Sequence, residues 1–397
     1  MKCLIYVPVA FLLASGVLTS AQSTTVCPTS AVFLAVTDYN TGTSEVRGYP
    51  TRANGPTAPC QVLEGTATTL STTNGMAISV HGDLHVVQFL TNGTVAVFPA
   101  AADGDEAPQR VESTYTNDLL AVATDARVDD FALSRREGPA AIAVILADKT
   151  TPSYSFNAPN FGQSDSLAVD TDDNLLVGGY DASGNALVET IGTASSLSSP
   201  ATVRSLAGPD TGMLPGDSSN FSNNQISIAV DPVSDELYVY TYSDATGHAE
   251  VSVFPPRASG DVKPTRVIAG PLAQLESPGE LNNKIAVASD GRLFVAEPND
   301  RILVVAPGVT GNVDSRANYP GLGARQNSGP AGRDRGPLVL MPLKSDPLIE
   351  VADQAALTGS SSSPFSIFSW QSMQVGVQGS ASRRFRPMVL PQCRHSP

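Results

Sequence analysis

The chain has 397 residues, of which 41% are hydrophobic, and a formal net charge of −14. This hydrophobic content is ordinary for a folded protein and excludes a chain that is disordered throughout. Residues 1–320 carry 34 acidic and 16 basic side chains, and such an acidic body argues against nucleic acid and anionic membranes as partners, because both would be repelled.

The N-terminal residues 1–21 predict a secretory signal peptide. Lys2 precedes an apolar run over Leu4–Leu18, and the small residues Thr19–Ala21 form a cleavage site. The run is short for a membrane span, and no later apolar stretch is long enough for one. We therefore expect a protein that is secreted, or periplasmic in a bacterium, with no membrane span.

Cysteine usage fits export, because an oxidising compartment permits disulfides. Beyond the signal peptide the cysteines are Cys27, Cys60 and Cys393. Cys27 and Cys60 lie in one repeat and can pair, which leaves Cys393 free or intermolecular; three unpaired thiols are the alternative. Asn92 and Asn220 begin glycosylation sequons, which have a meaning only in a eukaryotic source.

A twenty-residue phrase occurs four times, starting at Val46, Val95, Val251 and Ile302. Its clearest copies contain Val-Phe-Pro followed by four residues and a glycine. Self-similarity at a period near fifty residues indicates an array of one supersecondary unit. The interval between the second and third copies leaves room for two degenerate units, which we place near residues 131 and 166.

Each unit has the same order of short apolar runs separated by Gly, Asp, Asn and Pro. This pattern is typical of consecutive β-hairpins, and no window of helical length has a 3.6-residue period. The first run of each unit is rich in alanine and small β-branched residues, so we expect it to line a crowded central axis. Four strands in each unit predict an all-β, six-bladed β-propeller of four-stranded antiparallel blades.

Five units are predicted to begin near residues 76, 131, 166, 228 and 285. A sixth is incomplete, because it starts at its second strand, Ala31–Val36. Its innermost strand is expected from the C-terminal side, from Pro337–Met341 or Leu348–Val351. Such a strand would close the ring and remove the exposed edges of an open array.

The composition changes after Ala352. Ser360–Ser363 is of low complexity, and Arg383–Arg386 is a basic cluster. We therefore predict a propeller domain over residues 22–352 and a Ser/Arg-rich, mostly disordered tail over residues 353–397.

The units resemble NHL-type β-propeller repeats of secreted proteins. The best match is KIAVASDGRLFVAEPNDRILVVAPG, which starts at Lys284. It has a short apolar strand, an Asp-Gly turn, a strand with an aromatic residue, an Asn-Asp-Arg turn and a further apolar strand. The resemblance covers about residues 31–321 and is strongest over residues 226–321. It implies the fold and no single activity, because this fold hosts binding scaffolds and several hydrolases.

Three groups of polar residues resemble metal sites but are better explained by turns and strands. Asp170–Asn174 alternates oxygen ligands, yet it lacks the glycine and the distant glutamate of a calcium loop, so a hairpin turn is favoured. Asp103 and Asp105 are interpreted as turn residues of the proline loop. His81 and His85 are about 13 Å apart along a strand, which is too far for one metal ion.

The repeat phrase places a polar side chain at one fixed position, which is Gln61, Arg110 or Arg266 in three copies. Its recurrence favours a hydrogen bond between blades over a role in one active site. The chain has no nucleophile elbow of the Gly-x-Ser-x-Gly type and no phosphate-binding loop.

We therefore predict a monomeric, non-catalytic scaffold that binds a protein or glycan ligand on one rim. The alternative is a calcium-dependent hydrolase of lactonase or gluconolactonase type. The resemblance to such propellers implies one Ca²⁺ in the axial pore, held by single residues from different blades. Candidate ligands at strand starts are Asn74, Asp165, Asn224 and Asn283. Carboxylates and amides converging at one mouth of the pore would favour the hydrolase, whereas a pore lined by Ala, Val and Ser would exclude it.

Overall fold

The computed structural model describes residues 27, 31–38, 43–53, 57–88, 93–114, 119–134, 139–192, 201–216, 225–243, 246–275, 285–297 and 301–313. The chain divides into two compact units, Met1–Pro347 and Leu348–Pro397, and every described residue belongs to the first. Several predictions fall outside the described residues: the signal peptide, both candidate closing strands, the tail over residues 353–397, and the sequons at Asn92 and Asn220.

The described residues form 22 strands in six antiparallel sheets, here called blades 1 to 6. Blade 1 contains β1 (Ala31–Asp38), β2 (Thr43–Pro50) and β3 (Gln61–Leu63). Blade 2 contains β4 (Thr73–Ile78), β5 (Leu84–Gln88), β6 (Thr94–Phe98) and β7 (Arg110–Ser113). Blade 3 contains β8 (Leu119–Thr124), β9 (Asp130–Ser134), β10 (Ala140–Ile145) and β11 (Tyr154–Ala158).

Blade 4 contains β12 (Gln163–Val169), β13 (Leu175–Tyr180), β14 (Ala186–Gly192) and β15 (Ala201–Leu206). Blade 5 contains β16 (Gln225–Val230), β17 (Leu237–Ser243), β18 (His248–Phe254) and β19 (Arg266–Ala269). Blade 6 contains β20 (Ile285–Val287), β21 (Leu293–Glu297) and β22 (Arg301–Val305). The helical element of the described residues is a 3₁₀ turn, η1 (Pro209–Thr211), and they contain no apolar helix of the length that a bilayer requires.

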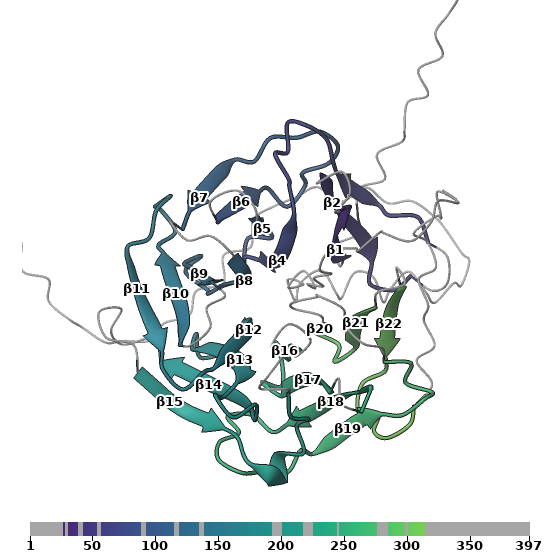
Figure 1. The fold of residues 1–397 in the computed structure, drawn as a ribbon. Helices are drawn as coiled ribbons and strands as arrows, with labels where there is room; N and C mark the ends of the chain where they lie inside the picture. Colours follow the sequence, from purple (N-terminus) through teal and green to yellow (C-terminus); the bar gives the residue numbers. More distant parts are fainter. Residues whose placement is uncertain are drawn as a thin grey trace, which may run out of the picture. The chain divides into compact units, whose positions relative to one another are not determined.

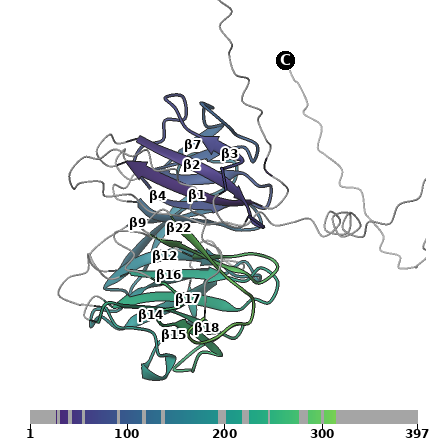
Figure 2. The same cartoon turned by 90° about the vertical axis from the view of Figure 1, so that its right-hand side faces the viewer.

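The six blades follow one another around a ring, so the fold is a six-bladed β-propeller, as predicted (Figure 1). Strands β4, β8, β12, β16 and β20 lie nearest the axis, and β7, β11, β15 and β19 lie at the periphery. Seen from the side, strands such as β12, β16 and β17 run from one face of the ring to the other (Figure 2). Blades 2 to 5 each have four strands, and blades 1 and 6 have three in the part of the chain that is described.

Blade 3 begins earlier than predicted. Asp130–Ser134 is its second strand, because the inner strand β8 is Leu119–Thr124. The turn after β8 has no Asp-Gly pair, which marks this turn in the better repeats. Asp125 shapes the turn instead, since its Oδ1 accepts hydrogen bonds from the N–H groups of Arg127 at 2.9 Å and Asp129 at 3.0 Å.

Each interface between neighbouring blades has its own apolar core. Because successive side chains of a strand point to opposite faces, an inner strand can contribute to two cores. In β5, Leu84 and Val86 pack in the cluster shared with blade 1, whereas Val87 packs in the cluster shared with blade 3. Six clusters of buried residues result, one at each interface. The interface that joins blade 6 to blade 1 includes Phe294 and Tyr49.

The repeat phrase forms a backbone clasp between neighbouring blades. Gly260 N–H donates to the Ser205 carbonyl at 2.7 Å, and Ala207 N–H donates back to the Gly260 carbonyl at 3.3 Å. Gly104 and Gly311 bridge the outer strands β3 and β19 in the same parallel manner. The three glycines have φ between +69° and +82°, the left-handed region that favours glycine.

The residue after each clasp glycine adds a side-chain hydrogen bond. Oδ1 of Asp261 accepts from the Asp210 N–H at 2.6 Å, and Asp105 and Asn312 accept from the preceding blade in the same way. The interpretation of Asp103 and Asp105 as local turn residues is therefore wrong, because each carboxylate accepts from a backbone N–H of the segment that forms and follows β3. The bonded residues are about forty positions apart in the sequence, so a pattern of neighbouring residues cannot predict this contact.

The polar side chain that recurs in the repeat phrase makes two different kinds of contact. Gln61 donates to a backbone carbonyl of blade 2, and Arg110 donates to a carbonyl of blade 3 at 3.1 Å, so both join neighbouring blades as predicted. Arg266 instead pairs with Glu236 and lies 5.6 Å from the ring centre of Tyr238, both in its own blade. The prediction of a contact between blades is wrong for Arg266, because Glu236 supplies a carboxylate within reach.

We expect the substitution Asp261→Ala to lower the free energy of unfolding by about 1 kcal/mol, because the Asp210 N–H loses a charged acceptor. Denaturant unfolding followed by circular dichroism measures the change. Asp148→Ala is the matched control, since Asp148 is exposed and contacts Lys149 alone among the residues described. Equal effects of the two substitutions would show that the Asp261 side-chain hydrogen bond adds nothing to stability.

Candidate functional site

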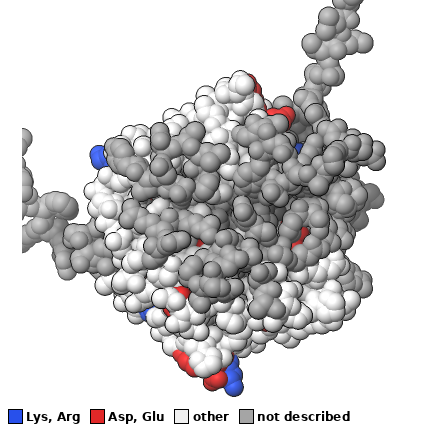
Figure 3. All heavy atoms as spheres, in the orientation of Figure 1, with Lys and Arg blue, Asp and Glu red and all other residues white. Residues whose placement is uncertain are grey.

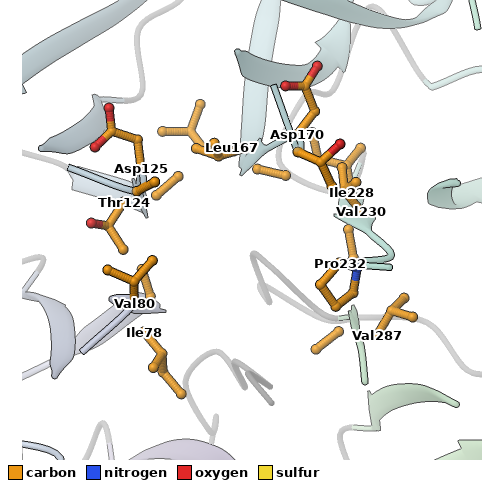
Figure 4. Close-up of a pocket in the computed structure, with 18 of the residues that line it drawn as sticks. Ile78, Val80, Thr124, Asp125, Leu167, Asp170, Ile228, Val230, Pro232 and Val287 are labelled. Carbon is orange, nitrogen blue, oxygen red and sulfur yellow. The ribbon is translucent and has the colours of Figure 1, made fainter. Parts of the chain in front are cut away.

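A cavity of about 290 Å³ lies on the ring axis, at the mouth where the inner strands end (Figure 4). Strands β4, β8, β12, β16 and β20 and the turns that follow them all contribute to its wall. Small and branched apolar side chains dominate this wall, as predicted for the first strand of each unit. The larger ones are Ile78, Val80, Leu167, Val169, Ile228, Val230, Ile285 and Val287.

Carboxylates lie at the rim of the cavity, but hydrogen bonds already occupy them. Oδ1 of Asp170 accepts from the backbone N–H of Asp172 at 3.0 Å and of Asn174 at 2.8 Å, and its Oδ2 accepts from Arg204 at 2.8 Å. Asp170–Asn174 is thus a hairpin turn between β12 and β13, as predicted. Asp125, in the rim turn of the neighbouring blade 3, holds its own turn and pairs with Arg127 at 2.7 Å.

Neighbouring rim turns are also tied to one another. Asp173 accepts from the Ala126 N–H at 3.2 Å, which joins blade 4 to blade 3. Asp235 accepts from the Thr171 N–H at 3.1 Å, which joins blade 5 to blade 4. Both aspartates have φ near +60°, a left-handed conformation that aspartate adopts more readily than most residues. The rim aspartates are therefore structural.

The described lining of the cavity is mainly apolar. Its described lining contains neither histidine nor cysteine nor an aromatic residue, and its carboxylates are engaged in turns. Val80 at the rim is 40% exposed, and Val233, next to the lining residue Pro232, is 72% exposed. An apolar group that entered this mouth would leave water and contact apolar walls, which is favourable.

The opposite ends of the inner strands are polar and buried. Asn74 donates from its side-chain amide to the Leu119 carbonyl at 3.1 Å, a bond between blades 2 and 3. Asp165 accepts from the Gln163 side chain at 2.7 Å within β12. Asn74 and Asp165, two of the four predicted calcium ligands, thus lie near the starts of inner strands. Each forms a hydrogen bond with a different residue. Asn224 and Asn283 lie outside the described residues.

The remaining sequence candidates lie away from the axis. A disulfide joins Cys27 and Cys60, which are 33 residues apart. His81 is exposed in a turn, whereas His85 is fully buried, so the two imidazoles are not brought together, as expected. The first strands were predicted to line the axis, but the position and size of the cavity were not, because it is formed by short runs of residues from five blades.

One face of the propeller is shown with its charges in Figure 3. Acidic and basic side chains are scattered over the described part of this face, and they form no continuous patch of either sign.

Comparisons with known proteins relate this fold to distant chains. No family model matches the sequence, and no curated protein matches it, so the NHL resemblance stays a prediction. A WD40 domain of coronin from Toxoplasma gondii is 9% identical, with a TM-score of 0.40; the match covers 70% of this chain but only 65% of that domain.

Two further solved structures are similar to this chain. A functionally unknown protein from Desulfotomaculum acetoxidans is 10% identical over 78% of this chain and 98% of its own, with a TM-score of 0.45. A putative 6-phosphogluconolactonase from Bacteroides uniformis is 11% identical over 73% of this chain and 82% of its own, with a TM-score of 0.46.

We expect Asp170→Asn to lower the free energy of unfolding by about 2 kcal/mol, because an amide cannot accept all of the hydrogen bonds of the buried carboxylate and leaves Arg204 without an anion. Asp172→Asn in the same turn is the control. Its exposed ion pair with Arg257 contributes little, so we expect a change below about 0.5 kcal/mol. Denaturant unfolding of both variants measures the difference, and equal losses would contradict a structural role for Asp170.

Proposed function

We propose that this propeller is a non-catalytic binding scaffold that takes a ligand at the axial cavity. The supporting observation is an apolar cavity whose rim carboxylates are already committed to turns and ion pairs. Such a site offers shape and apolar contact, and the carboxylates of its described lining are already hydrogen-bonded. A rigid ring that holds loops and turns around one cavity is well suited to recognition.

A protein ligand fits the cavity better than a glycan does. Sugar rings commonly stack on aromatic side chains, and the described lining contains none. Valine, isoleucine and leucine walls suit an apolar side chain of a peptide. Because residues 1–320 carry a net charge of −18, the preferred partner presents this side chain among lysines or arginines.

We also propose that the protein works outside the cytoplasm as a monomer. The predicted signal peptide supports export, and the disulfide between Cys27 and Cys60 is of a kind that persists in oxidising compartments.

Selection from a displayed library of random peptides tests the proposal. We expect the immobilised protein to enrich peptides with one large apolar residue flanked by basic residues. The substitution Val80→Asp should weaken the binding of an enriched synthetic peptide at least tenfold, because it places a charge where the apolar side chain inserts. Fluorescence anisotropy with the labelled peptide measures the dissociation constant.

Val203→Asp is the matched control for this experiment. Val203 is 56% exposed on the outer strand β15, compared with 40% for Val80 at the rim, so both substitutions add one charge to a partly exposed valine. The control should leave the dissociation constant unchanged. Equal weakening by both variants, or no enriched peptide at all, would contradict binding at the axial cavity, and binding on a glycan array would identify the other ligand class.

The calcium-dependent lactonase is the second candidate, because Asn74 and Asp165 do begin inner strands. Titration with micromolar Ca²⁺ followed by thermal unfolding tests it. We expect no rise in melting temperature, since a ligand stabilises the folded state only if it binds there. A clear rise, together with hydrolysis of a lactone that EDTA abolishes, would replace the scaffold by the hydrolase.

A further inference from the structure

The interface between blades 2 and 3 differs from a purely apolar one, because ionisable residues occupy core positions. In β5, β6 and β7, cross-strand pairing aligns His85 with Val97 and Val95 with Glu112 on one face. The valines of this face pack in the core shared with blade 3. On blade 3, Asp130 precedes Ala132 by two positions, so both point toward the same interface.

The three ionisable side chains meet inside this core. His85 and Glu112 are 0% exposed and Asp130 is 1% exposed. His85 Nδ1 lies 2.6 Å from Oδ2 of Asp130, so the carboxylate orients the imidazole across the boundary between the blades. Each of the three residues offers one ligand atom, and these atoms all lie within 4.8 Å of one another.

Each residue of the cluster also has a buried polar atom without a hydrogen-bond partner. These atoms are Nε2 of His85, Oε2 of Glu112 and Oδ1 of Asp130. Buried polar atoms normally have partners, because leaving one unsatisfied costs about 1–3 kcal/mol. Three such atoms in one small region indicate a missing occupant that can bind nitrogen and oxygen together.

The charge of the cluster points to a positive occupant. Arg110 donates to Oε1 of Glu112 at 2.7 Å and neutralises one of the two carboxylates. Of the two buried carboxyl groups, that of Glu112 has an arginine partner and that of Asp130 has only His85 among the described residues. A cation bound between them would balance the second carboxyl group.

We propose that His85, Glu112 and Asp130 bind a first-row divalent metal ion, with Zn²⁺ as the probe, and that the ion joins blade 2 to blade 3. One imidazole and two carboxylates form a donor set that suits zinc. Calcium is disfavoured, because it prefers six to eight oxygen ligands. The site is separate from the axial cavity and does not depend on the proposed function.

Zinc content of the full chain tests the proposal. The protein is expressed in zinc-supplemented medium and, in parallel, stripped with EDTA in denaturant with its disulfide intact and refolded with ZnCl₂. After gel filtration, mass spectrometry of the metal should give about one zinc per chain, as one set of ligands requires. X-ray absorption at the zinc edge should show one imidazole with oxygen ligands and no sulfur.

Three variants assign the metal to the cluster. Glu112→Gln and Asp130→Asn each remove one anionic ligand with little change of shape, and each should reduce zinc affinity at least tenfold. Glu189→Gln is the matched control, because Glu189 is also 0% exposed and contacts Asn160 and Thr202 instead. The control should retain its zinc, and circular dichroism verifies that each variant is folded.

Several outcomes would overturn the proposal. Less than about a tenth of a zinc ion per wild-type chain in both preparations would show that the cluster does not bind the metal. Sulfur ligands in the absorption spectrum would place the metal at cysteines. Equal loss of zinc from Glu189→Gln and from the two cluster variants would show that the metal does not bind at the cluster. The wild-type measurements decide the question even if a cluster variant fails to fold.

Discussion

No blade of this propeller can bury both of its apolar faces by itself. Alternation along each strand produces two apolar faces, and each face is covered by a different neighbour, as in β5 with Val86 on one side and Val87 on the other. The fold is therefore held by six interfaces rather than by one central core. The axial cavity, the rim turns and the clasps all have fixed geometry because these interfaces set the positions of the blades.

Much of the fold follows from the sequence, because the information is local and repeated. Hairpins such as β20–β21 are marked by an Asp-Gly turn between apolar runs, and a recurring phrase sets the number of units. Blade 3 shows the limit of this approach. Its first turn uses Asp125 side-chain hydrogen bonds in place of a glycine, so β8 has no clear boundary in the sequence.

The candidate sites could not be predicted in the same way, because their residues come from different blades. A pattern search along β5 considers His85 only beside His81, its near neighbour in sequence. In the folded protein, His85 forms a hydrogen bond with Asp130 of blade 3 and lies close to Glu112 of the outer strand β7. One feature of the sequence did point to this cluster, because His85 occupies a position where the alternation of β5 requires an apolar residue.

The boundary between blades 6 and 1 brings together the two ends of the ring. Arg292 donates to the Thr51 carbonyl across 241 residues of sequence, and Val32, Leu34 and Tyr49 of blade 1 pack with residues of blade 6. During translation at ordinary rates, blade 1 therefore waits roughly 10 to 50 s with an uncovered apolar face before the ribosome has made its neighbour. The first of the six blades to be synthesised is thus the one whose second interface forms only after the last blade has been made.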